Sequence, residues 1–91
     1  MSMIVEIPKN LAVEESVSLR EDILLMIKDG EKDFLLNFEN CKFIDSTGLG
    51  VLVAIYKRTS EKGGSLKLKS VNEQVMKLFR LTRLDKVFQF L

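Results

Sequence analysis

Residues 43–52 read Phe43-Ile44-Asp45-Ser46-Thr47-Gly48-Leu49-Gly50-Val51-Leu52. They follow a strand-like run and open a long apolar stretch that ends in two glycines, which predicts a strand-to-helix turn. Ser46 is then expected close to a helix N-terminus, where free backbone N–H groups and the helix dipole favour negative charge. The glycines of the stretch have no side chain to keep another backbone or a phosphate away. The stretch therefore predicts a serine suited to phosphorylation.

Segments of alternating type surround this turn. Strands are expected at residues 3–7, 33–38, 66–69 and 87–90, and helices at residues 18–29, 46–62 and 72–79. Pro8 ends the first strand and puts it near a sheet edge, and residues 9–15 are expected to form a loop. Ser18 with Glu21 fits a capping box for the first helix, and Asn72 can cap the third.

Strands that alternate with helices indicate βαβ units with right-handed crossovers. The expected fold class is therefore α/β, with a mainly parallel four-stranded sheet and three helices. A length of 91 residues fits one small domain that occupies residues 1–91.

The composition excludes several classes of protein. No run of about 18 apolar residues exists, so no membrane span is expected, and the N-terminus lacks the pattern of a signal peptide. The single cysteine, Cys41, cannot form an internal disulfide, which favours the reducing cytoplasm. The chain has no histidine, the commonest general base and metal ligand. We therefore expect no enzyme, no metal and no cofactor.

Charge is unevenly distributed along the chain. Residues 1–45 hold five Lys and Arg against ten Asp and Glu, whereas residues 46–91 hold nine against three. The densest basic part comprises Lys77, Arg80, Arg83 and Lys86. A nucleic-acid-binding domain would have a higher pI or aromatic residues among its cations. We therefore interpret these cations as a solvated helix face, with no nucleic acid as partner.

Ser46 has two other interpretations. It could simply cap the helix, since Asp, Ser and Thr are the usual N-cap residues. It could be a hydrolase nucleophile, but the chain offers no histidine as base, and Asp45 is better suited to capping or steadying the turn. The phosphate-binding P-loop pattern is absent. Cys41 is expected to be a small buried residue.

The helix after Ser46 carries two sets of apolar residues. Helical spacing puts one stripe toward the sheet, made of Leu49, Leu52, Val53 and Tyr56. Val51 and Ile55 project elsewhere. They either pack against a neighbouring helix or form an exposed apolar patch beside the serine for a partner.

Residues 37–52, and more loosely residues 4–90, resemble the STAS domain of bacterial anti-sigma-factor antagonists. The family's Asp-Ser-Ser/Thr-Gly-Leu-Gly run appears here as residues 45–50, and matches further along the chain are Tyr56-Lys57, Gly63-Gly64 and Val75-Met76-Lys77-Leu78-Phe79. The resemblance implies that the anti-sigma factor, a serine kinase, phosphorylates Ser46 and not Thr47. It also implies that a PP2C-type phosphatase reverses the modification.

The chain departs from the family pattern in three places. The family's Gly-Glu-Leu-Asp turn corresponds here to residues 9–12, which lack its acidic residue, and Arg83 replaces the Gly usual after the third helix. The family's C-terminal helix is absent from these 91 residues. These departures leave the expected fold intact and bear on the partner and on phosphorylation.

Together these observations predict an anti-sigma-factor antagonist that binds its partner only while Ser46 is unphosphorylated, and so releases a sigma factor. The expected partner-binding residues are Asp45, Ser46, Thr47, Gly48, Leu49, Gly50, Val51 and Ile55. The alternative is a structural STAS subunit of a larger assembly, such as a lipid-transport complex or a stress-sensing scaffold, in which Ser46 only caps the helix.

Overall fold

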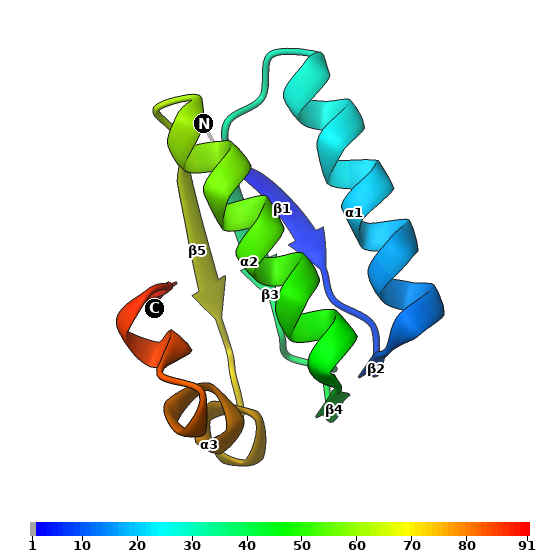
Figure 1. Cartoon of the computed structure of the whole chain (residues 1–91), viewed down its shortest axis with the longest axis vertical. Coiled ribbons are helices and arrows are strands. Elements are labelled where there is room, and N and C mark those ends of the chain that lie inside the picture. The colour runs from blue at the N-terminus through cyan, green and yellow to red at the C-terminus, as the bar shows by residue number, and fades with distance from the viewer. Residues whose placement is uncertain (1) are drawn as a thin grey trace.

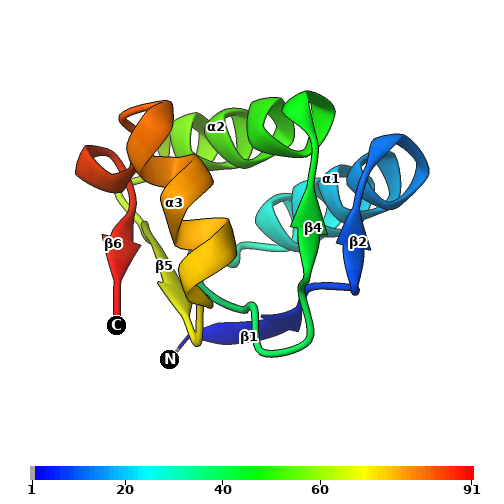
Figure 2. The same cartoon turned by 90° about the horizontal axis from the view of Figure 1, so that it is seen from below.

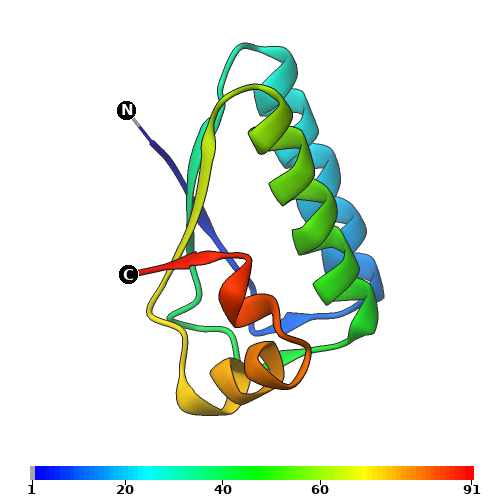
Figure 3. The same ribbon diagram turned by 60° about the vertical axis from the view of Figure 1, so that its left-hand side comes forward.

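Four parallel strands form the main sheet, and two long helices lie side by side over one of its faces (Figures 1 and 3). The computed structural model describes residues 2–91. In chain order the elements are β1 (Met3–Glu6), β2 (Asn10–Leu11), α1 (Val13–Lys28), β3 (Asp33–Asn37), β4 (Phe43–Ile44), α2 (Ser46–Glu61), β5 (Ser65–Lys69), α3 (Glu73–Leu81), the 3-10 helix η1 (Leu84–Lys86) and β6 (Gln89–Phe90).

The main sheet has the strand order β1-β3-β5-β6, and all of its strands are parallel. The predicted α/β class, with four strands and three α-helices, is confirmed, as is the edge position of β1 before Pro8. Strand alternation separates two faces. Leu36 and Leu68, aligned in register, are fully buried, whereas Ile4 in the neighbouring row is 62% exposed. Figure 3 shows that this second face has no helix over it.

An aromatic cluster joins α3 and the C-terminal segment to the rest of the core. The ring of Phe79 lies 6.0 Å from that of Phe38 and 5.8 Å from that of Phe88, both in edge-to-face arrangements. Phe88 also meets Tyr56 of α2 edge to face, at 5.9 Å. Such pairs add about 0.5–1.5 kcal/mol beyond the burial of their area. They hold α3 against the end of the sheet at which the strands terminate (Figure 1).

The start of α1 differs from the prediction. Residues 9–15 are not a loop, because β2 lies at residues 10–11 and the helix begins at Val13. Ser18 and Glu21 are exposed residues inside the helix, so the predicted capping box is wrong. Ser16 is a fully buried polar residue, so the spacing of apolar residues alone does not reveal that the first turn is helical. Ala12 occupies the N-cap position and supplies no side-chain hydrogen bond.

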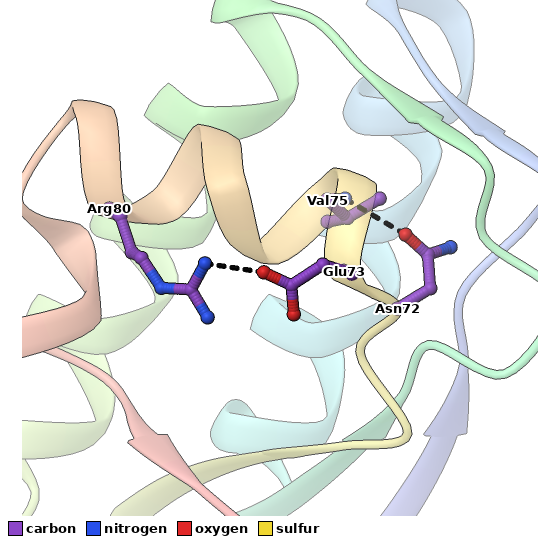
Figure 4. Close-up of polar contacts among 4 residues, drawn as sticks. All are labelled: Asn72, Glu73, Val75 and Arg80. Atoms are coloured by element: carbon purple, nitrogen blue, oxygen red, sulfur yellow. Dashed lines mark hydrogen bonds and ion pairs between the residues drawn. The ribbon is translucent and has the colours of Figure 1, made fainter.

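The N-terminus of α3 agrees with the prediction. Asn72 Oδ1 accepts a hydrogen bond from the backbone N–H of Val75 at 2.8 Å (Figure 4). Arg80 donates to Glu73 at 2.6 Å on the same helix, and this hydrogen bond lowers the pKa of Glu73. Both side chains are largely exposed, so the pair contributes little to stability. The four cations predicted to form a solvated face are all exposed.

Arg83, which replaces the glycine of the family pattern, adopts a left-handed backbone conformation with φ of 63°. A glycine adopts this conformation without steric cost, whereas a residue with a Cβ does not. The preference of the family for glycine at this place thus has a local backbone reason, and the substitution by arginine leaves the turn into η1 in place.

Candidate functional site

The stretch 43–52 crosses from β4 into α2 at the edge of the molecule where the parallel strands end (Figures 1 and 2). The turn is held by a second, two-stranded parallel sheet in which Asn10 pairs with Phe43 and Leu11 with Ile44. Sequence patterns did not reveal this sheet, because each of its strands has only two residues. Open α/β sheets commonly bind ligands beyond the carboxyl ends of their strands.

Asp45, and not Ser46, is the N-cap of α2. Its Oδ1 accepts a hydrogen bond from the backbone N–H of Gly48 at 2.8 Å. Ser46 is the first residue of the helix, and both Ser46 and Thr47 are exposed. The predicted place of Ser46 at a helix start is confirmed, while the interpretation of Ser46 as the cap is wrong.

The Ser46 hydroxyl is therefore free for chemistry with a partner. Within residues 2–91 it makes no hydrogen bond, whereas the Asp45 carboxylate is occupied by the cap. The first backbone N–H groups of a helix have no acceptor within the helix, so they can stabilise an oxygen that becomes negatively charged. This end of α2 can accommodate a phosphate on Ser46.

Gly48 and Gly50 have different surroundings. A Cβ at Gly48 would lie 2.4 Å from the backbone oxygen of Leu11 and 2.8 Å from Cγ1 of Ile44. The helix start can thus approach β2 and β4 only because residue 48 has no side chain. A Cβ at Gly50 would meet nothing within 4 Å, and Gly50 is exposed. Packing therefore explains Gly48 but not Gly50.

This difference makes a matched pair of variants. We expect Gly48→Ala to lower the free energy of unfolding by about 1–3 kcal/mol, because the backbone of β2 must move. Gly50→Ala should instead raise it by about 0.5–1 kcal/mol, because alanine favours a helix interior. Chemical denaturation of both variants checks this. Equal effects of the two substitutions would contradict the close approach at Gly48.

Val51 and Ile55, which were expected among the partner-binding residues, are buried, so the interpretation of an exposed apolar patch is wrong. Val51 is 9% exposed and Ile55 is 1% exposed, whereas Leu49 and Val53 of the predicted sheet-facing stripe are only half-buried. The buried positions of α2, at residues 48, 51, 52, 55 and 59, form one stripe that is shifted from the predicted one, because α2 packs on the sheet and also against α1 (Figure 3). Of the two interpretations of Val51 and Ile55, internal packing is the one that fits.

Exposed apolar residues gather instead between β4 and α3. A hollow of about 300 Å³ is lined by Lys42, Phe43, Ile44, Gln74, Val75, Lys77, Leu78 and Leu81. Phe43 is 52% exposed and Leu81 is 74% exposed. The Asn72 side-chain amide donates to the backbone oxygen of Cys41 at 2.8 Å and so ties α3 to the loop before β4. We call these eight residues the β4/α3 groove.

The β4/α3 groove adjoins the phosphorylation candidate, because Phe43 and Ile44 immediately precede Asp45 and Ser46. Its members come from segments about 30 residues apart, and no periodic pattern within one segment connects them. The sequence shows only that Phe43 and Leu81 are apolar, and their exposure follows from the structure.

Among residues 2–91, no group of three His, Cys, Asp or Glu side chains could hold a metal ion. Cys41 is buried, and burial raises the pKa of its thiol, so the reactive thiolate is disfavoured. In the same part of the chain, no helix combines the length and the apolar character needed to cross a bilayer.

Comparison with known proteins agrees with this geometry. A family model of the STAS domain matches residues 2–91. The anti-sigma-B factor antagonist of Bacillus subtilis is 34% identical over 83 residues, which cover 91% of this chain and 75% of that protein.

Solved structures share the fold. A Thermotoga maritima protein is 30% identical, with a TM-score of 0.86 over 96% of this chain and 77% of that one. The Bacillus cell fate determinant SpoIIAA in its phosphorylated form is 20% identical, with a TM-score of 0.77 over 97% of this chain and 80% of that one. The likeness to SpoIIAA concerns the fold alone.

Proposed function

Because the chain belongs to the STAS domain family, and within it to the anti-sigma-factor antagonists, we propose that it binds an anti-sigma factor and thereby releases a sigma factor. Phosphorylation of Ser46 switches this binding off. The observation that carries the proposal is the exposed Ser46 on the first residue of α2, beside an aspartate that already caps the helix. The chain acts by binding and not by catalysis.

The effect of the phosphate follows from where its charge lies. Phosphorylation adds about −1.5 to −2 charges at Ser46. The first turn of α2 tolerates this charge, whereas a partner surface that covers Ser46 with an acidic or apolar group does not. A penalty of about 3 kcal/mol weakens binding more than a hundredfold.

The partners in this switch follow from the family. The anti-sigma factor is itself the serine kinase that modifies Ser46, and a PP2C-type phosphatase removes the phosphate. These partners act on transcription, so we place the chain in the cytoplasm. The existence of a phosphorylated form of SpoIIAA, whose fold this chain shares, supports the choice of a phosphorylation switch.

The partner surface extends from Ser46 in two directions. Thr47, Leu49 and Gly50 continue it along α2, and the open space at Gly50 lets a partner backbone come close. The β4/α3 groove continues it on the other side, with two exposed apolar residues to bury and the cations Lys42 and Lys77 at its rim. A partner with an apolar anchor and acidic neighbours fits this surface.

This surface can be tested with exposed leucines. We expect Leu81→Ser to weaken binding to the anti-sigma factor about tenfold, because the variant loses an apolar contact to the partner. The Leu81 side chain is 74% exposed in the free chain, so the substitution leaves the core undisturbed. Leu25→Ser on α1, where the leucine is 62% exposed, is the matched control and should leave binding unchanged. Titration calorimetry measures both. Equal affinities of the two variants would remove the β4/α3 groove from the interface.

The function as a whole is tested by phosphate transfer. The chain is incubated with its anti-sigma factor and ATP, and the phosphate is mapped by mass spectrometry. The proposal expects a single phosphate on Ser46 and a stable complex only before the reaction. A chain that binds no anti-sigma factor, or that carries phosphate without losing affinity, contradicts it. The structural-subunit alternative gave Ser46 the role of a cap, whereas the N-cap of α2 is Asp45.

A further inference from the structure

A second groove lies between α1 and α2, away from the Ser46 turn. Two hollows of about 220 and 420 Å³ adjoin there and share Leu24 and Arg58. Together they are lined by Arg20, Leu24, Ile27 and Lys28 from α1 and by Ala54, Ile55, Lys57, Arg58, Glu61 and Lys62 from α2 and its end. We call these ten residues the α1/α2 groove.

The α1/α2 groove concentrates positive charge. It contains five Lys and Arg residues and one acidic residue, Glu61. The whole chain has 14 Lys and Arg against 13 Asp and Glu, so the residues outside the groove have nine against twelve. The groove thus carries a formal charge of +4 on a molecule whose other residues sum to −3. Because charges of one sign that line a concave region reinforce one another's electric field, the groove attracts an anionic partner.

In the part of the chain that the structure describes, the groove cations form no ion pair. Among residues 2–91, the only side-chain ion pair joins Glu73 and Arg80, on a different helix. All five cations are exposed, whereas the residues between them, Leu24, Ile27, Ala54 and Ile55, are apolar and half-buried or buried. The groove therefore has an apolar floor and a basic rim.

The size of the groove favours an acidic helix over a small anion. From Arg20 to Lys28 the helix advances about 12 Å, as it does from Ala54 to Lys62. Cations spread over that length on two helices can pair with several carboxylates at once. The apolar floor can be buried by an apolar side chain of the partner. An amphipathic helix of two to three turns with acidic flanks provides both.

Other anionic partners fit less well. The groove-lining residues include no aromatic side chain on which a nucleic-acid base could stack. A bilayer surface is flat and does not reach a recessed floor. A second copy of this chain offers the acidic hollow lined by Glu6, Glu14, Glu15 and Asp22, but that hollow is concave, and two concave surfaces do not interlock.

We propose that the α1/α2 groove is a docking site for an acidic amphipathic helix of a partner protein, separate from the Ser46 switch. Ala54 lies eight residues after Ser46 and Lys62 lies sixteen after it, which are about 12 and 24 Å along α2. A helix in the groove leaves the Ser46 surface free. The chain can therefore hold two partners at once, and phosphorylation of Ser46 does not control the second.

The test uses a fluorescein-labelled 14-residue helical peptide with one leucine stripe flanked by glutamates, titrated with the full chain and followed by anisotropy. We expect Arg58→Glu/Lys62→Glu to weaken binding at least tenfold. The matched control, Lys32→Glu/Lys86→Glu, makes the same change in net charge at exposed sites outside the groove and should have little effect. Ala54→Leu, which fills the floor without changing charge, should also weaken binding, and Ser46→Asp should not.

Several outcomes would overturn the proposal. If the two charge-reversal variants lost the same affinity for the peptide, the attraction would be unspecific. The same would follow if the Ala54→Leu variant bound the peptide as tightly as the unmodified chain. Stronger groove-dependent binding of duplex DNA or anionic phospholipid vesicles would assign the groove to those partners. Groove-dependent dimerisation in sedimentation experiments would assign it to a second copy. Thermal unfolding of every variant establishes that the fold is intact, and a failure of Ser46 phosphorylation would not affect these results.

Discussion

The phosphorylated chain should bind its anti-sigma factor more than a hundredfold more weakly than the unmodified chain. Ser46 is exposed on the first residue of α2, and its new charge would lie where the partner approaches. Ser46→Ala should keep binding and lose phosphorylation. Ser46→Asp should bind more weakly than the unmodified chain but less weakly than the phosphoserine form, because one carboxylate has less charge and fewer acceptor oxygens.

Thr47→Ala is the matched control for this series. Thr47 is also exposed in the first turn, so it competes with Ser46 as an acceptor on accessibility alone. We expect the Thr47→Ala variant to accept phosphate as the unmodified chain does. Titration calorimetry against the anti-sigma factor and phosphate incorporation measure the series. Phosphate on Thr47, or equal affinities before and after modification, would contradict the mechanism.

The largest expected effect on stability belongs to Leu52→Ala. Leu52 lies on the buried side of α2 and is fully buried in the core, so removing its branched end leaves a cavity that the packed sheet cannot fill. We expect the free energy of unfolding to fall by about 2–5 kcal/mol. Urea denaturation measures the fall.

Leu25→Ala controls for the change of residue type. It makes the same substitution in a helix at a side chain that is 62% exposed, and should change stability by no more than about 0.5 kcal/mol. Equal midpoints for the two variants would mean that α2 does not bury Leu52. Ile55→Ser should also be strongly destabilising, because Ile55 is 1% exposed and a hydroxyl there would lack a partner.

Two features of the candidate site followed from local sequence. Ser46 was expected at the start of a helix from the strand-like run before it and the apolar stretch after it, and α2 does begin there. Asp45 was expected to cap or steady the turn, and its carboxylate does accept the Gly48 N–H. Caps and helix starts depend on residues three or four apart, so a short stretch of sequence contains the information.

Other features of the site could not be predicted in this way. The β2–β4 pair joins residues more than 30 positions apart through strands of two residues, too short for any periodicity. The buried face of α2 depends on α1 as a second neighbour. The sequence left two interpretations of Val51 and Ile55 open, and the contact with α1 places both in the core. The β4/α3 groove combines residues from two distant segments, which the Asn72 hydrogen bond to Cys41 ties together.

Local sequence patterns indicated the alternation of strands and helices, the edge position of β1, the cap at Asn72 and the place of Ser46 on its helix. Each depends on contacts between near neighbours in the chain, whose geometry is set by helix and strand periodicity. The packing of the elements against one another determines which face of α2 is buried, which glycine must lack a side chain, and where the two grooves lie. These depend on how α1, α2, α3 and the short strands pack together, because burial is a property of all the neighbours of a residue and not of its own segment.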